Sequence, residues 1–155
     1  MHLYLRTHVA APPAQVFTGF TRELFLALAP PFPPFRLLRF DGCQRGDEVH
    51  IELGAGPLRR RWTSLITDNG VLPDGTHYFV DAGRELPAPL RSWQHRHLMQ
   101  PAPGGGSFIV EDIEYRTASS LLDRLLYPVM WAQFAWRRPI YRRVFGLPLP
   151  ISYAA

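Results

Sequence analysis

Residues 90–99 (LRSWQHRHLM) and 107–116 (SFIVEDIEYR) alternate in character and are joined by the segment PAPGGG at 101–106. Alternation of this length predicts two long strands, and the proline- and glycine-rich segment predicts the loop between them. The sequence therefore predicts an antiparallel hairpin over residues 90–116.

The two predicted strands place several polar groups together. Because strand side chains alternate between faces, Trp93, His95 and His97 share one face of the first strand. A turn near the centre of the loop brings Glu111 opposite His95 or His97. A carboxylate beside an imidazole favours the imidazolium and fixes its orientation. Together with Tyr115 on the face of Glu111, these residues are the first candidates for a site.

Outside the hairpin, the same periodicity predicts further strands. They cover residues 2–9, the region from Arg36 to 53, and residues 58–67 and 76–81. Turn signals separate them at 54–57, 68–70 and 73–75. Between the first and second strands, Pro12 and Pro13 predict the start of one short helix, and Thr21 predicts the cap of another that ends at Pro30.

The C-terminal part of the chain has helical periodicity. A helix is predicted from Ser119 or Ser120 to about Phe145, followed by Gly146 and by prolines at 148 and 150. Pro128 and Pro139 lie inside it and should kink or interrupt it, because each lacks a backbone N–H.

The order of elements indicates one domain over residues 1–155. A strand, two short helices, six strands and a long helix form an α+β arrangement, in which an antiparallel sheet of seven strands needs a cover on one face. The C-terminal helix is the one predicted element long enough to supply that cover. We expect a curved sheet wrapped around it.

Composition limits the function classes. The chain is 46% hydrophobic and carries a formal charge of +4, with 17 basic residues that are all arginine. No nucleic-acid motif surrounds the arginine runs, so no nucleic-acid partner is expected. A single cysteine, Cys43, excludes an internal disulfide and a cysteine-rich metal site. With no signal peptide pattern and no apolar run long enough for a bilayer, we expect a soluble, cytoplasmic protein without stable membrane insertion.

Several motifs, taken in order, resemble one family. These are Arg61-Trp62, Phe79-Val80-Asp81, the pattern Trp-x-His-x-His at 93–97, the segment from Gly105 to Tyr115, and Phe134-Ala135-Trp136-Arg137. The chain resembles the START-like or Bet v 1-like superfamily, also labelled SRPBCC or polyketide-cyclase-like, and within it a bacterial branch with a Trp-x-His-x-His strand. It departs from that branch at Gly83-Arg84 and at Met99.

This resemblance implies a helix-grip fold with a cavity between the sheet and the C-terminal helix. We therefore expect a module that binds a hydrophobic small molecule or lipid, with no cofactor. The candidate ligand contacts are Trp62, Trp93, His95, His97, Glu111, Tyr115, Met130, Trp131 and Phe134. The loops Phe32–Phe35 and Leu86–Leu90 are expected to gate entry.

Other interpretations stay open at this point. An acid–base pair of His95 or His97 with Glu111 would suit a cyclase or aromatase, although no nucleophile motif accompanies it. The His-x-His strand could hold a metal, but structural histidines are the simpler interpretation and we predict no metal site. A third alternative is a partner-binding or homodimeric domain with a vestigial cavity, supported if aromatics near Trp136 and Tyr141 were exposed. The arginine pairs at 137–138 and 142–143 are expected on a solvated helix face.

Overall fold

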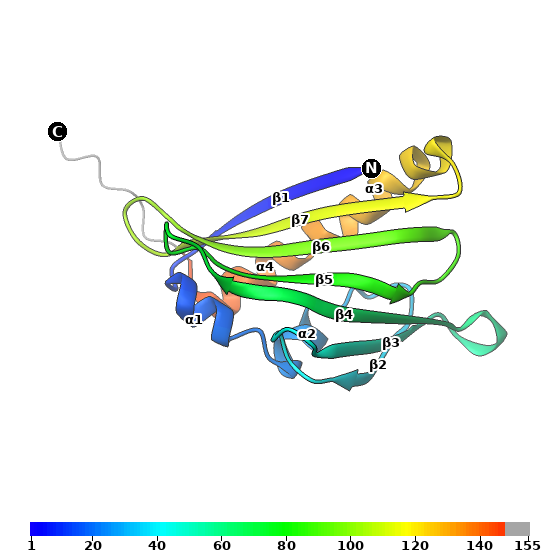
Figure 1. Cartoon of the computed structure of the whole chain (residues 1–155), viewed down its shortest axis with the longest axis horizontal. Coiled ribbons are helices and arrows are strands. Elements are labelled where there is room, and N and C mark those ends of the chain that lie inside the picture. The colour runs from blue at the N-terminus through cyan, green and yellow to red at the C-terminus, as the bar shows by residue number, and fades with distance from the viewer. Residues whose placement is uncertain (148–155) are drawn as a thin grey trace.

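The computed structural model describes residues 1–147, and its main feature is a seven-stranded antiparallel sheet (Figure 1). The strands are β1 (His2–Val9), β2 (Phe35–Phe40), β3 (Glu48–Leu53), β4 (Arg60–Val71), β5 (His77–Glu85), β6 (Leu90–Pro101) and β7 (Ser107–Thr117). Their order in the sheet is β1-β7-β6-β5-β4-β3-β2. Six of the strands therefore form a meander, and β1 pairs with the last of them.

The hairpin of β6 and β7 has the predicted register. Trp93 pairs with Tyr115, His95 with Ile113 and His97 with Glu111. The prediction that Glu111 lies opposite one of the two histidines is therefore confirmed.

One predicted turn is wrong. Residues Asp68–Gly70 lie inside β4, and the chain reverses after it, around Asp74. The pairing of β4 with β5 shifts register between Ile66 and Asp68, and this irregularity lets the strand continue. The Tyr78 hydroxyl donates to Asp68 at 3.0 Å, so a residue type typical of turns is held in a strand.

The two short helices follow their predicted signals. Helix α1 (Pro13–Thr18) begins at a proline, and α2 (Arg22–Ala27) is capped by Thr21, whose hydroxyl accepts from the backbone N–H of Leu24. A short 3₁₀ turn, η1 (Gly56–Leu58), connects β3 to β4. Both α-helices lie between β1 and β2 in sequence, and the segment after α2 leads to the edge strand β2.

The long C-terminal helix is two joined pieces. Helix α3 (Ser120–Ala135) is capped by Ser119 and contains Pro128, and α4 (Arg137–Phe145) follows directly. Pro139 has no N–H to donate to the carbonyl of Ala135, which explains why the helix is interrupted at Trp136. Gly146, with φ of 82°, follows the end of α4, and the prolines at 148 and 150 lie outside the described residues.

Helices α3 and α4 cross one face of the sheet (Figure 1). Two groups of buried side chains pack between the helices and the sheet. One joins α1, α2 and α4 to residues such as Phe79 and Met99, and the other joins α3 to Leu3, Trp93 and Tyr115. Of the described helices, none is both long and apolar enough to cross a bilayer.

Candidate functional site

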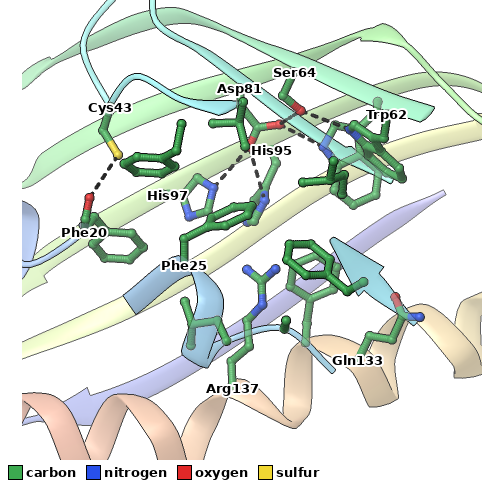
Figure 2. A pocket seen from close by; sticks show the side chains of 18 of the residues that line it. Phe20, Phe25, Cys43, Trp62, Ser64, Asp81, His95, His97, Gln133 and Arg137 are labelled. Carbon is green, nitrogen blue, oxygen red and sulfur yellow. Dashed lines mark hydrogen bonds and ion pairs between the residues drawn. The ribbon is translucent and has the colours of Figure 1, made fainter. Parts of the chain in front are cut away.

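A cavity of about 170 Å³ lies between the sheet, α2 and α3 (Figure 2). Most of its wall is apolar and comes from α2 and the segment after it, from β2 to β6, and from α3. The apolar lining includes Phe20, Phe25, Leu28, Pro33, Phe35, Phe40, Val49, Ile51, Leu53, Ile66, Phe79, Met130 and Phe134. The volume is many times what one water molecule needs, so a small organic molecule is a suitable occupant.

The polar part of the wall on the sheet is centred on Asp81 of β5. Its Oδ1 accepts hydrogen bonds from the Ser64 hydroxyl at 3.0 Å and from the Trp93 indole at 3.1 Å, and its Oδ2 lies 3.1 Å from Nε2 of His97. The indole of Trp62 donates to the Ser64 hydroxyl at 3.0 Å. Neighbouring strands β4, β5 and β6 thus supply one connected network that lines the cavity (Figure 2).

His95 and His97 lie side by side on β6. Their ring centroids are 3.6 Å apart, and the ring of His97 stacks on Phe79 at 4.1 Å. On one side both rings approach Asp81, and on the other both approach Oε2 of Glu111, at 2.6 Å from His95 Nε2 and 3.6 Å from His97 Nδ1. Neither of these last two nitrogens has a well-directed hydrogen bond among the described residues. The imidazole pair therefore separates a buried carboxylate, Glu111, from a partly buried one, Asp81.

Glu111 is held from the helix side. Its Oε1 accepts from the Tyr141 hydroxyl at 2.6 Å, and Nη1 of Arg137 lies 3.4 Å away. The guanidinium of Arg137 also lies over the Phe134 ring, 4.2 Å from its centroid. Glu111 is 2% exposed, so α4 closes this end of the cluster against solvent.

Both carboxylates stay ionised. Burial acts to raise their pKa values, but the charge of Arg137 and the contact with His95 hold the pKa of Glu111 well below its ordinary value. For Asp81 the opposing influences are the hydrogen bond from His97 and the electrostatic effect of the two neighbouring imidazoles, and its pKa is also lowered.

The other titrating groups respond to the same burial. Burial, assisted by the electrostatic effect of the neighbouring His95, lowers the pKa of His97 to about 4, so this imidazole is neutral at neutral pH. Burial and the negative charge of Glu111 raise the pKa of Tyr141 well above its ordinary value, so its hydroxyl remains a donor. Burial raises the pKa of the cavity-lining thiol of Cys43 to about 12.

The structure brings most of the predicted ligand contacts together. Six line the cavity: Trp62, Trp93, His95, His97, Met130 and Phe134. The other three, Glu111, Tyr115 and Trp131, are not among its described lining residues. The Tyr115 hydroxyl instead donates to the backbone carbonyl of Asp123 at 2.7 Å, and Trp131 is 44% exposed on α3. Of the two predicted gate loops, the first contributes Pro33 and Phe35 to the lining.

Sequence reasoning missed three members of the cluster. Asp81 belongs to one of the sequence motifs but is not among the predicted site residues. Arg137 is predicted on a solvated face, yet its side chain is 19% exposed and reaches Glu111. Tyr141 is a candidate for exposure in the sequence, yet it is 1% exposed. Their signal is the spacing of Phe134, Arg137 and Tyr141 at three and four residues, which places them on one side of a helix.

Asp81, His95 and His97 also form a group that could hold a metal ion, since one ligand atom from each lies within 4.8 Å of the others. The planes of the two imidazole rings are tilted by 34°, with the ring centroids 3.6 Å apart. Because imidazole lone pairs lie in the ring planes, convergence on one ion would require the rings to turn. The present arrangement suits a hydrogen-bonded network better.

Comparison with family models and with curated protein sequences finds no match. Solved structures do match. The protein TTHA0849 from Thermus thermophilus is 14% identical with a TM-score of 0.63, covering 93% of this chain and 97% of its own. Norcoclaurine synthase from Thalictrum flavum is 13% identical with a TM-score of 0.63, covering 95% and 94%. The ZhuI aromatase/cyclase from Streptomyces sp. R1128 is 16% identical with a TM-score of 0.57, covering 95% and 99%.

These identities are too low to transfer an activity, but the likeness extends over almost the whole chain. The resemblance inferred from the sequence motifs is confirmed at the level of architecture. The chain has the Bet v 1/START-like helix-grip fold.

Proposed function

We propose that this protein binds an apolar small molecule in the cavity between the sheet and α3. The observation that carries the proposal is an apolar cavity with a localised polar wall at Asp81, His95 and His97. Ligand sites are typically concave and mostly apolar, with a few fixed polar groups that orient the ligand. Here the polar groups hold one another in position before any ligand arrives, which lowers the ordering cost of binding.

The polar wall would orient one end of the ligand. Asp81 offers an ionised acceptor, and His97 offers a neutral ring that stacks on Phe79. On the opposite side, Gln133 and Arg137 reach the cavity from the helices (Figure 2). A ligand with one hydroxyl or carbonyl group on an otherwise apolar body fits this distribution.

A cyclase or aromatase remains the second candidate function, because the imidazole of His97, which is hydrogen-bonded to the carboxylate of Asp81, lines the cavity. Its chemistry would need a general base with a pKa near the working pH. The pKa of His97 at about 4 makes this ring a weak base, and Glu111 is engaged by Tyr141 and Arg137. These properties favour binding over proton abstraction by the pair predicted from the sequence.

Native mass spectrometry of freshly purified protein, followed by denaturing extraction, tests the proposal directly. A co-purifying apolar molecule at near-stoichiometric amount is the expected result. A matched pair of variants locates the site: Ala29, just after α2, lines the cavity, whereas Ala27, the last residue of α2, is exposed and is not among the lining residues. Ala29→Trp should remove the molecule, and Ala27→Trp should retain it. Retention in both variants would place the ligand elsewhere.

Cys43 provides a second readout on the unmodified chain. Its thiol lines the cavity and its Sγ lies 3.6 Å from the Phe20 carbonyl oxygen. Since the thiolate is the reactive form, the raised pKa predicts alkylation at least about 100-fold slower than in urea. Addition of the extracted molecule should slow alkylation further. An unchanged rate at saturating ligand would contradict binding in this cavity.

A further inference from the structure

The outward side of α3 is apolar, although it faces no other part of the described chain. Leu121, Leu125, Val129 and Trp136 are 67%, 63%, 51% and 48% exposed, and Trp131, elsewhere on the circumference of the same helix, is 44% exposed. Their spacing of four, four and seven residues places the first four on one side of the helix. The opposite side, with Phe134 and Met130, packs toward the sheet and the cavity. Helix α3 is thus apolar on both sides, which is unusual for a helix at a protein surface.

The same part of the chain is strongly basic. After Asp123 the sequence contains Arg124, Arg137, Arg138, Arg142 and Arg143 and no acidic residue. Arg137 points inward to Glu111, whereas Arg124, Arg142 and Arg143 are exposed. Asp123 is 7% exposed, and its Oδ1 accepts from the backbone N–H of Thr117 at 2.6 Å, so it does not offset these charges at the surface. We define Leu121, Leu125, Val129, Trp136 and the three exposed arginines as the α3–α4 face.

We propose that the α3–α4 face docks on the surface of an anionic lipid bilayer. Exposed leucine and tryptophan side chains bordered by arginines are the chemistry of helices that lie in the plane of a membrane interface. Each arginine near an anionic surface adds to the attraction, and the apolar side chains enter the headgroup region. This docking is peripheral and is independent of the proposed ligand.

Charge disfavours the main competing occupant, a second copy of the chain. A two-fold pairing through α3 would be isologous, so both partners would bring the same patch. In an antiparallel pairing Arg124 of one copy approaches the arginines of α4 in the other, and like charges then meet at both ends. An acidic surface neutralises these arginines instead.

The α3–α4 face lies next to the cavity, so docking on a bilayer would also position the cavity. Gln133 lines the cavity, and Val129 and Trp136 precede and follow it by four and three residues on the helix. The face therefore borders the helix side of the cavity. A protein docked in this way would hold the cavity beside the apolar part of the bilayer.

Co-sedimentation of the full chain with lipid vesicles tests the proposal. Vesicles of phosphatidylcholine containing about one third phosphatidylglycerol should bind the protein, pure phosphatidylcholine should bind it much less, and salt should weaken the binding. The double variant Arg142→Glu, Arg143→Glu should lower the partition constant at least about tenfold. The control Arg22→Glu, Arg45→Glu changes net charge equally on exposed residues elsewhere and should retain more of the binding.

A second pair of double variants tests how much the exposed apolar side chains contribute to vesicle binding. Leu125→Gln with Trp136→Gln should reduce binding at least about tenfold, whereas Val71→Gln with Leu72→Gln, exposed at the end of β4, should leave it nearly unchanged. Circular dichroism checks that each variant is folded. An equal loss of vesicle binding in the test and control variants would overturn the proposal. Concentration-dependent dimerisation that Trp136→Gln abolishes would also overturn it. So would tighter binding of duplex DNA than of the vesicles by the same face. Because no cavity ligand is used, failure here leaves the proposed function intact.

Discussion

The two carboxylates on either side of the histidine pair differ in what surrounds them. Glu111, on the side of β7 and α4, is 2% exposed and is engaged by Tyr141, Arg137 and His95. Asp81, on the side of β5, has a side chain that is 13% exposed and lines the cavity. The two carboxylates therefore have different uses. Helix α4 covers the half of the cluster that contains Glu111, whereas the half that contains Asp81 faces the cavity.

This difference predicts that the Glu111 side contributes mainly to stability and the Asp81 side mainly to ligand contact. An ion pair that is closed off from water is costly to break, because the remaining partner stays buried and uncompensated. A carboxylate at a cavity wall can exchange partners with water or a ligand at lower cost. The following measurements, ordered by expected effect, test that contrast.

Glu111→Gln should have the largest effect. It removes the charge that Arg137 and His95 face, while keeping the shape, and should lower the free energy of unfolding by about 3 kcal/mol. Urea denaturation at neutral pH measures the change. Glu114→Gln, on the same strand but with a side chain 58% exposed and 3.2 Å from Arg96, is the control and should cost less than about 1 kcal/mol. Equal losses of unfolding free energy in the two variants would contradict the distinction between the buried contacts of Glu111 and the surface pair of Glu114 and Arg96.

Acid should destabilise the protein from pH 6.5 downward. The pKa of His97 falls from 6.5 to about 4 on folding, so in this range the unfolded chain binds a proton that the folded chain does not. The free energy of unfolding then decreases as pH falls, by up to about 1.4 kcal/mol per pH unit. Glu111 and Asp81, whose pKa values are lowered in the fold, stabilise it above their ordinary pKa values and add to the loss at lower pH.

Urea denaturation between pH 7 and 5, compared between the natural chain and His97→Gln, isolates the histidine contribution. The variant should show a flatter dependence on pH over this range. His8→Gln, outside the cluster, should retain the natural slope. If His97→Gln also retained the natural slope, His97 would not be the group that titrates.

Tyr141→Phe should have an intermediate effect. It keeps the ring and removes the hydroxyl that donates to Glu111 at 2.6 Å, which should cost about 1.5 kcal/mol. Tyr78→Phe is a close control, because its hydroxyl also donates to a carboxylate, that of Asp68 at 3.0 Å, but at an exposed position. The control should lose less than about 0.5 kcal/mol. Equal losses would show that enclosure by α4 adds nothing.

Asp81→Asn should have the smallest effect on stability, less than about 1 kcal/mol. The asparagine carbonyl can still accept from Ser64 and Trp93, and its amide can donate to a neutral His97. Its expected effect is on the cavity, measured as a loss of affinity for the molecule extracted from the natural protein. A stability loss as large as that of Glu111→Gln would contradict the division between the two sides.

Much of the fold was predictable because local patterns specify it. Strict alternation in 90–99 and 107–116 gives strands, and the register of their hairpin follows from the loop between them. The resemblance of the ordered motifs indicates the helix-grip fold from sequence alone. The turn expected at 68–70 was wrong because a register shift and the bond from Tyr78 hold Asp68 in β4, and neither is visible in local sequence.

The site was predictable only in part, because local sequence patterns do not show contacts between distant segments. Alternation placed His95 and His97 on one face and Glu111 opposite them, since strand geometry is local. It could not show that α4 returns to Glu111, because a contact between residues 111 and 141 depends on how the helix packs across the sheet. Arg137 therefore looked like a surface residue, and its burial follows from packing over Phe134.

The sequence by itself determined the kinds of elements, their order and the residue types that could meet, because backbone preferences and side-chain periodicity are properties of short segments. The tertiary structure decided which carboxylate is enclosed, which one lines the cavity, and which side of α3 is left uncovered by the other elements of residues 1–147. Those outcomes depend on distances between segments that are far apart in the chain, and the closure of helices over a curved sheet sets them.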